Sequence, residues 1–538
     1  MRGDSMQFIR KNWMYLIIIV IFGGILLTVS INKEEAASNN YLLDKTLISE
    51  QEKIDEKMTE DSKEATFKNP YIKLNPYGTA PLSAVAIFET EEPTKISLEV
   101  KGETAETTIR TSNSSYKTKH HLSILGLYAD KNNTVTITAE TKDGMKATKV
   151  VSIRTKALPK DFTKLDVTKV NTTKMEQTDS SLTFVVPSTK WAYGVDSAGE
   201  VRYYSTKYNS HVFKELKNGH LLYLTKYENS DDTYSLLLET DYVGKIYRAY
   251  KMKSDAESET SGSSQKSAIH HDAIELPSGN LLLTINDETK YMEDTMIEIN
   301  RNTGEVVKEI DLKNILPAKF YKSFSARGDG KIDWFHQNAV VYDTSDDSII
   351  ISGRNQDTVM KLDYETSQIK WILSDDEGWP VNYQKYLLKS VDNVMKFPAG
   401  QHAPIILPDQ DNNDETVDIL LYDNNVVVSR GDTQESKKYS QAIQYRVNEK
   451  NKTIEEVWSY GKERGEEYFT NIIGSARYMP TTGNRLVNFG YLAEGKESRI
   501  VEVDKNGKVV YELRLSDFPS SAWSYRAERF SLYSGNKE

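Results

Sequence analysis

The chain has 538 residues, no cysteine and a formal net charge of −11. The acidic balance argues against a nucleic-acid-binding protein, and the lack of cysteine excludes disulfides, thiolate metal sites and a cysteine nucleophile. The length favours two domains or one large closed architecture, and short runs of Val, Ile, Thr and Tyr between turn residues indicate a mostly β protein.

An uncharged apolar segment lies near the N-terminus. Trp13 to Ile31 contains no charge over 19 residues, about the length that crosses a bilayer core, and basic residues stand at positions 2, 10 and 11. The positive-inside rule then predicts a cytoplasmic tail over 1–12 and a transmembrane helix over 13–31, with the remainder outside the cell. A signal peptide cleaved near Ala36-Ala37-Ser38 is the alternative. We expect a single-pass protein of the cell membrane with an extracellular catalytic domain.

Two segments precede the main body. Residues 32–65 are polar, but Leu43, Leu47, Ile54 and Met58 fall on one helical face. This pattern predicts a polar stalk with an amphipathic helix that either pairs with another chain or packs on the body. Residues 66–157 contain short strand patterns between turns, which predicts a small N-terminal β-sandwich domain. Its two adjacent histidines, His120 and His121, are expected to be structural or surface residues.

A weak repeat runs through residues 158–538. Its clearest element is a turn followed by a strand, as in AGEVRYY, TGEVVKEI and NGKVVYEL, and six copies span positions 199 to 507. A turn followed by an apolar strand, as in NGHLLYL and SGNLLLT, lies between the copies. A period of roughly 62 residues with several strands each is typical of propeller blades. We therefore expect an all-β protein, with a six-bladed β-propeller catalytic domain over 158–538 that follows the small β-sandwich and the transmembrane helix.

Polar residues, several of them histidines, precede the strands expected to be innermost. These segments are His270-His271-Asp272, the run DWFHQN that contains His336 and Asn338, Gln401-His402, and the run GSAR that contains Ser475 and Arg477. Innermost strands begin around a central channel, so these side chains are expected to converge on one small ligand. Strand alternation predicts that His336 and Asn338 point the same way, and that only one of His270 and His271 faces the channel.

Arg354 ends the strand pattern IIISGR. Its guanidinium can bind an oxyanion through two parallel hydrogen bonds. Trp334 and Phe335 are expected in the core rather than in an aryl pocket. The long polar loop 253–268, next to His270, is expected to act as a lid.

These motifs together resemble one known family. The segments HHD, LPSGNLLLT, DWFHQN, SIIISGRNQD and GQHAPIIL, in this order, look like those of bacterial arylsulfate sulfotransferases, and the likeness covers about residues 70 to 530. The resemblance implies transfer of a sulfuryl group from an aryl sulfate to another phenol, independent of 3'-phosphoadenylyl sulfate. It implies small-molecule substrates. It also implies a homodimer, as in the family, but the absent cysteine and the expected anchor leave the oligomeric state open.

The resemblance also implies roles for individual residues. His402 corresponds to the nucleophile that becomes a sulfohistidine, and His271 to a histidine that contacts the sulfuryl oxygens or handles the phenol proton. His336, Asn338 and Arg354 correspond to the remaining sulfuryl-binding residues.

The residue chemistry fits these roles independently. A neutral imidazole is a competent nucleophile, fixed donors stabilise the sulfuryl oxygens, and a further imidazole can move the phenol proton. We therefore predict a site without metal or cofactor. Its catalytic residues are His402, His271, His336 and Arg354, and its substrate-binding residues are Asn338, His270, Ser475 and Arg477.

Two other functions stay open. Three channel histidines can hold a zinc ion in a metal-dependent hydrolase or lyase, although Arg354 would repel a dication and the chain has no HExxH spacing. A non-enzymatic extracellular propeller that binds glycan or protein would use the histidines as channel filling. Such a protein would not need Asn338 and Arg354 beside them.

Overall fold

The computed structural model describes residues 41–227, 234–252, 269–286, 290–392, 395–519 and 522–534. Within these ranges the regular structure is almost entirely β, with helices α2 (Lys45–Asp61) and α3 (Ala318–Lys322) and short 3-10 turns. The predicted transmembrane helix (13–31) and the predicted lid (253–268) lie outside them. None of the helices in the described ranges is long and apolar enough to cross a membrane.

The N-terminal domain is one antiparallel sheet that bends through its longest strand, β3. Residues 84–89 of β3 pair with two strands, and residues 94–100 pair with two others. The two halves therefore form separate layers around shared apolar residues, as expected for the small β-sandwich. Its strands are β2 (Tyr71–Leu74), β3 (Ala84–Val100), β4 (Ile109–Ser112), β5 (Lys117–Ile124), β6 (Asn132–Thr141) and β7 (Lys146–Arg154).

The rest of the chain forms five curled, mainly antiparallel sheets. In hydrogen-bonding order, the largest contains β1 (Tyr41–Leu43), β14 (Ile246–Met252), β13 (Leu236–Thr240), β12 (Leu221–Thr225), β11 (Val201–Glu215), β10 (Trp191–Val195), β9 (Ser181–Pro187) and β32 (Ser524–Ser531). Two four-stranded sheets follow: β15 (Ile269–Glu275), β16 (Leu281–Ile285), β17 (Thr295–Ile299) and β18 (Val306–Asp311), then β19 (Gln337–Asp343), β20 (Ser348–Gly353), β21 (Thr358–Asp363) and β22 (Ile369–Leu373).

The last two sheets have five strands each. One contains β23 (Lys389–Ser390), β27 (Thr453–Tyr460), β26 (Gln441–Asn448), β25 (Thr416–Asp423) and β24 (His402–Ile406). The other contains β28 (Ser475–Met479), β29 (Asn484–Leu492), β30 (Glu497–Val503), β31 (Val509–Ser516) and β8 (Lys164–Val170).

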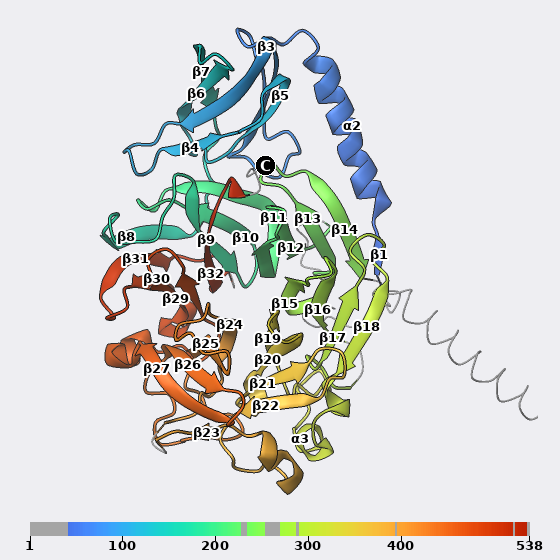
Figure 1. The fold of residues 1–538 in the computed structure, drawn as a ribbon, viewed down its shortest axis with the longest axis vertical. Helices are drawn as coiled ribbons and strands as arrows, with labels where there is room; N and C mark the ends of the chain where they lie inside the picture. Colours follow the sequence, from blue (N-terminus) through green and yellow to red (C-terminus); the bar gives the residue numbers. More distant parts are fainter. Residues whose placement is uncertain are drawn as a thin grey trace, which may run out of the picture.

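These sheets surround a common centre (Figure 1). Contacts between strands run from β11 to β15, β19, β24, β28 and β32 in turn, and β32 contacts β11. The ring is also closed by hydrogen bonds, because β32 pairs with β9 and β8 pairs with β31. The all-β, propeller-like part of the prediction is therefore confirmed.

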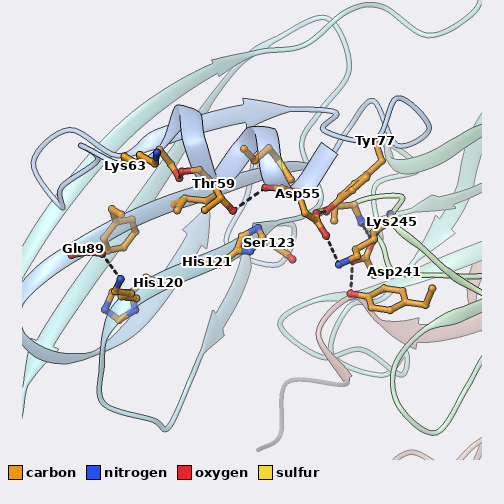
Figure 2. A pocket seen from close by; sticks show the side chains of 17 residues that line it. Asp55, Thr59, Lys63, Tyr77, Glu89, His120, His121, Ser123, Asp241 and Lys245 are labelled. Carbon is orange, nitrogen blue, oxygen red and sulfur yellow. Dashed lines mark hydrogen bonds and ion pairs between the residues drawn. The ribbon is translucent and has the colours of Figure 1, made fainter. Parts of the chain in front are cut away.

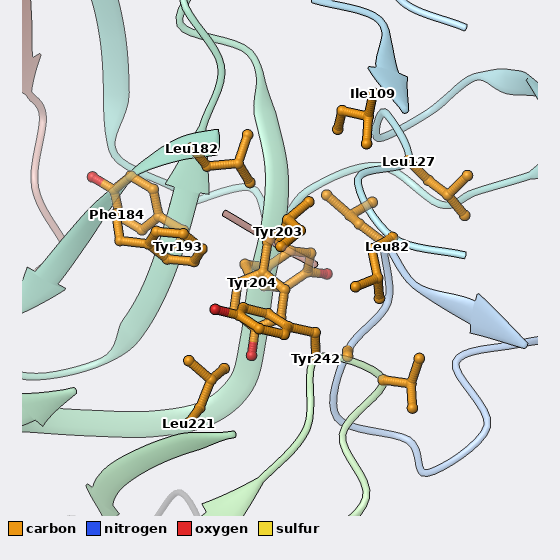
Figure 3. Packing of buried hydrophobic residues seen from close by; sticks show 14 of the residues in the cluster. Leu82, Ile109, Leu127, Leu182, Phe184, Tyr193, Tyr203, Tyr204, Leu221 and Tyr242 are labelled. Carbon is orange, nitrogen blue, oxygen red and sulfur yellow. The ribbon is translucent and has the colours of Figure 1, made fainter. Parts of the chain in front are cut away.

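One hydrophobic core joins the N-terminal domain to the first sheet of the ring. Leu82, Ile109 and Leu127 of the domain lie near Tyr203 and Tyr242 of the ring (Figure 3), and all belong to one cluster of buried residues. Helix α2 packs against the same cluster through Leu47, Ile54 and Met58. The amphipathic helix thus lies on the body of its own chain.

Candidate active site

Four of the innermost strands share a backbone irregularity beside the group of histidines. His211, His271, His336 and Ala403 have positive φ values of 55°, 35°, 54° and 52°. In each strand the pairing register with the next strand shifts at or beside this position. Such bulges re-aim side chains beside functional sites, and simple alternation does not hold through them. This is why His270 and His271 are both buried in the same group instead of facing opposite ways.

The group centres on the ring of His271. Ring centroids of His336, His211 and His270 lie 4.7, 5.2 and 5.2 Å from it, and that of Tyr525 lies 5.9 Å away. Burial, followed by the neighbouring imidazoles, lowers the pKa of His271 well below its usual value. Burial and then Arg526 lower the pKa of His211 to about 3. Both rings are therefore neutral near pH 7.

His336 is the exception. Its Nδ1 lies 2.7 Å from Asp333 Oδ2 and 2.7 Å from Glu293 Oε2. Burial alone would lower its pKa, but the two carboxylates outweigh burial and raise the pKa to about 10. His336 is thus an imidazolium near neutrality, and its Nε2 is the ring nitrogen left for a substrate.

His402 begins β24 and is almost completely buried, with 3% of its surface exposed. Its Nδ1 lies 2.6 Å from Asn424 Oδ1 and 3.0 Å from the carbonyl oxygen of Gly400. Burial, and then the positive charge of Arg354, lower its pKa well below the usual value. The result is a neutral imidazole held at one nitrogen and within the field of a guanidinium.

Two of the predicted anion-binding residues lie around His402. Arg354 Nη2 donates to the carbonyl of Asn471 at 3.2 Å and Nη1 to Asn355 Oδ1 at 2.9 Å. Its Nε is buried without a hydrogen-bond partner among the described residues. Asn338 Nδ2 donates to the carbonyl of Gln401 at 2.7 Å, so this amide supports the backbone beside His402.

The turn that carries His402 is bound to the turn that carries Arg354. Asp357, which ends the 3-10 turn Arg354–Gln356, is 1% exposed and accepts the backbone N–H of Gly400 at 2.8 Å through Oδ1. Its Oδ2 accepts the N–H groups of residues 428, 429 and 430 at 2.9, 2.6 and 3.0 Å. Gly400 has φ 63°, and a Cβ there would lie 2.8 Å from a carbonyl oxygen. The turn two residues before the histidine therefore requires glycine.

A buried ion cluster lies next to these imidazoles. Asp272 Oδ1 is 2.6 Å from Lys214 Nζ and 3.1 Å from Arg526 Nη1, and Asp272 Oδ2 accepts the N–H of Val340. Arg526 Nη2 also donates to the carbonyl of Asn338 at 2.8 Å. The cluster therefore ties four of the innermost strands, β11, β15, β19 and β32, together beside the site.

Ser475 and Arg477 differ from the expectation. Ser475 Oγ accepts the N–H of Ala527 at 3.2 Å and is fully buried. Arg477 forms a two-pronged ion pair with Glu528, from Nε to Oε2 and from Nη2 to Oε1, both at 2.8 Å. It lines a separate pocket of about 450 Å³ with Lys214 and Ile405. Among the described residues around that pocket there is no histidine. Arg477 lies two residues further along β28 than Ser475, so its side chain starts roughly 7 Å further from the beginning of that strand.

Two groups of side chains have donor atoms suited to a metal ion, within 4.8 Å of one another: His270, His271 and Glu293, and Glu293, Asp333 and His336. Both groups use the carboxylate of Glu293, whose Oε2 lies 2.7 Å from His336 Nδ1. That carboxylate already balances the charge of a protonated imidazole. We assign no metal to either group.

A larger pocket of about 730 Å³ lies away from these imidazoles, against α2 and β5 (Figure 2). His121 lines it, and His120 stacks on Phe88 with ring centroids 5.1 Å apart. Lys245 pairs with Asp55 at 2.7 Å across it. These contacts fit the structural and surface roles expected for the two histidines. Trp334 and Phe335 are fully buried in the core, as predicted.

Several residues of the site carried no sequence signal of their own. Glu293 lies between β16 and β17, and Asn424 follows β25, so neither occupies a position that the repeat marks. Tyr525 and Arg526 arrive with β32, which closes the ring from the far end of the chain. Asp272 directly follows His271 in the motif HHD, and Asp333 lies three residues before His336 in DWFHQN, so nearness to a histidine in the sequence was the available signal.

Two stretches of the chain match known families. Residues 167–526 match the family described as Arylsulfotransferase (ASST), and residues 71–156 match the Arylsulfotransferase Ig-like domain. Arylsulfate sulfotransferase AssT of Escherichia coli O6:H1 is 26% identical over 400 residues, which are 62% of this chain and 64% of that protein. The protein of the same name from Lelliottia amnigena is 25% identical over 403 residues, 63% of this chain and 64% of that one. The chain thus spans less than two thirds of the length of these relatives.

Similarity to solved structures is low. The periplasmic gluconolactonase PpgL of Pseudomonas aeruginosa aligns with a TM-score of 0.34 and 12% identity, over 81% of this chain and 99% of that one. A value this low supports no conclusion about the function of this chain.

Proposed function

Because the chain belongs to the arylsulfotransferase family, whose pattern its residues 167–526 match, we propose that it moves a sulfuryl group from a phenolic sulfate ester to another phenol. The two relatives from Escherichia coli and Lelliottia amnigena carry the name of this activity. The observation that carries the proposal is the site itself. His402 is neutral and buried, and its neighbours include the guanidinium of Arg354 and the imidazolium of His336.

The transfer proceeds in two steps. First, a nitrogen of His402 attacks sulfur, an N–S bond forms, and the S–O bond to the aryl group breaks, so that its electron pair leaves with the phenolate oxygen. Arg354 and His336 stabilise charge on the sulfuryl oxygens. In the second step the acceptor phenol gives up its proton, attacks sulfur and frees His402. The two half-reactions make this a ping-pong mechanism with a sulfohistidine intermediate.

His336 and His271 have different roles. With a pKa of about 10, close to that of an ordinary phenol, His336 can return a proton to a departing phenolate and accept one from an incoming phenol. His271 is neutral and lies with its ring centroid 4.7 Å from that of His336, where it contacts the sulfuryl group or relays the proton. Asn338 and His270 support these residues from the adjacent strands.

Further parts of this proposal concern architecture. We infer six blades, because the eight-stranded sheet passes from one blade to the next within the long strand β11, and four further sheets complete the ring. The inter-strand contacts around the centre involve six strands, which supports this count. The domain limits, the membrane anchor over 13–31, the extracellular location and a homodimer remain predictions from the sequence.

The test uses the purified protein with 4-nitrophenyl sulfate, with and without phenol. We expect nitrophenolate release that depends on phenol, is lost in His402→Ala and is unchanged in His121→Ala, a control histidine outside the site. Intact mass after a short incubation without phenol should show a sulfo group on the wild type but not on His402→Ala. Release that needs no phenol and stops with a chelator would contradict the proposal in favour of a metal-dependent hydrolase. No release from several aryl sulfates would favour a binding protein.

A further inference from the structure

Asn424 contacts the proposed nucleophile directly. It follows β25 and is fully buried, and its Oδ1 lies 2.6 Å from Nδ1 of His402. This is the shorter of the two contacts that this ring nitrogen makes, since the carbonyl of Gly400 lies 3.0 Å away. The contact joins the first residue of β24 to the residue that follows β25, its neighbour in the same sheet.

The orientation of the Asn424 amide is fixed by its other partners. Nδ2 donates to the carbonyl of Thr470 at 3.0 Å and to the carbonyl of Ile473 at 2.9 Å. Carbonyl oxygens only accept hydrogen bonds, so the amide nitrogen must face them and Oδ1 must face His402. Ser440 Oγ donates to the same Thr470 carbonyl at 3.1 Å, which holds this acceptor in place.

This orientation determines where the imidazole carries its proton. Both groups next to His402 Nδ1, Asn424 Oδ1 and the Gly400 carbonyl, are acceptors, so Nδ1 must be the N–H donor. In a neutral imidazole the other nitrogen, Nε2, then carries the lone pair. Nε2 is therefore the atom that attacks sulfur.

We propose that Asn424 is a positioning residue of the transfer reaction, which holds His402 in the Nδ1–H tautomer with Nε2 aimed at the sulfuryl group. This role rests on the function proposed above. As the Nε2–S bond forms and the S–O bond breaks, positive charge develops on the ring. The Nδ1 proton stays in place, and Asn424 Oδ1 stabilises that charge through the same hydrogen bond. When the acceptor phenol takes the sulfuryl group, the ring returns to its neutral form without a change of tautomer.

An amide suits this position better than a carboxylate. The nearby positive charges of Arg354, His336 and Arg526 act together with burial to keep His402 neutral. A carboxylate at Nδ1 would favour the protonated imidazolium, which has no lone pair at Nε2. The hydrogen bond to the neutral amide also raises the pKa of His402, but burial and the nearby cations outweigh it.

The first measurement is the tautomer of His402 in the substrate-free protein. Long-range ¹H–¹⁵N correlation spectra of histidine-labelled protein, with His402→Gln for assignment, should show the Nδ1–H form in the wild type. Asn424→Asp, which keeps an acceptor, should keep the proton on Nδ1 but shift the ring toward the imidazolium, with a second proton on Nε2. Asn424→Ala, which removes the acceptor, should shift the signal toward a mixture of tautomers. A wild-type spectrum with the Nε2–H form would overturn the proposal, whatever the activity of the protein.

The second measurement is transfer from 4-nitrophenyl sulfate to phenol. We expect Asn424→Ala to lower kcat/KM by roughly 10- to 100-fold, mainly through kcat, because the ring loses its fixed aim. Asn133→Ala is the matched control, since this buried asparagine binds backbone carbonyls in the N-terminal domain, at Tyr128 and Ile153. It should lower the melting temperature but leave kcat/KM unchanged.

The outcomes separate this role from the proposed function. A folded Asn424→Ala protein with wild-type kcat/KM and an unchanged His402 signal would show that Asn424 is only structural. If the wild type itself transfers no sulfuryl group, the proposed function fails. The tautomer spectra would then still report whether Asn424 fixes the ring.

Discussion

Replacement of Asp357 by asparagine tests how the His402 turn is held. An amide has one acceptor oxygen where the carboxylate has two, and its nitrogen only donates. If the remaining oxygen keeps the three N–H groups of residues 428–430, the amide nitrogen faces the N–H of Gly400, which loses its partner. The opposite orientation leaves three N–H groups unpaired, so the first is favoured. One buried, unpaired N–H costs about 1–3 kcal/mol, and this cost falls on the residue two before His402.

The expected result is a local defect with a catalytic effect. Asp357→Asn should lower the free energy of unfolding by about 1–3 kcal/mol in urea titrations. Hydrogen exchange should accelerate at the Gly400 amide more than at neighbouring amides of β25. Since a shift of about 1 Å in a reacting group can cost about 100-fold, transfer from 4-nitrophenyl sulfate should fall by up to that factor.

A matched control is available on an outer turn. Asp504 also accepts two backbone N–H groups through one oxygen, at 2.9 and 3.0 Å, and lies away from the site. Asp504→Asn should therefore leave transfer unchanged. An Asp357→Asn protein with normal Gly400 protection and normal kcat would refute the idea that this carboxylate positions the His402 turn.

Two further predictions concern the ion pairs around the channel. Burial opposes ionisation of Asp272, but Arg526 and Lys214 outweigh it and lower its pKa to about 2, so this carboxylate stabilises the fold above pH 3.8 and loses that effect as the pH falls toward 2. Urea titrations from pH 5 to pH 2 should show about 2 kcal/mol of this loss in the wild type and none of it in Asp272→Asn. At pH 7 the variant should be about 3–5 kcal/mol less stable, because the buried Arg526 and the partly exposed Lys214 lose their anionic partner. Equal pH slopes in the two proteins would contradict this. Arg477→Ala should keep the wild-type kcat/KM in the nitrophenyl sulfate assay, because the Arg477 guanidinium is bound to Glu528. A loss of more than about 10-fold, or 1.4 kcal/mol, would show instead that Arg477 binds the substrate.

The fold could be predicted because its signals are local and repeated. Turn residues before apolar strands recur along the chain, and this recurrence requires sheets that stack on one another. The position of helix α2 could not be predicted, because Leu47, Ile54 and Met58 require an apolar partner without specifying which one. The partner is the core shared by the N-terminal domain and the ring.

Residues of the site could be predicted only where a residue with suitable chemistry stands at a position that the strand repeat marks. His271, His336 and His402 lie at or near the starts of equivalent strands, and this is why the sequence predicted that they converge. The alternation rule failed at His270 and His271 because a bulge changes the direction of consecutive side chains, and a single sequence does not mark a bulge. The partners that set protonation, such as Glu293 and Asn424, come from loops and strand ends whose distances depend on the closed ring.

The pairing of β9 with β32 has a consequence for folding during synthesis. It joins residues 181–187 to residues 524–531, so a nascent chain that has emerged only to about residue 500 has one sheet edge without its partner. An unpaired edge is a template for association with other chains, and contacts this distant in sequence form slowly. The same strand delivers Tyr525 and Arg526 to the imidazole group. A chain without β32 therefore has both an unpaired sheet edge, which favours aggregation, and an incomplete site. The pairing that removes the unpaired edge also completes the site.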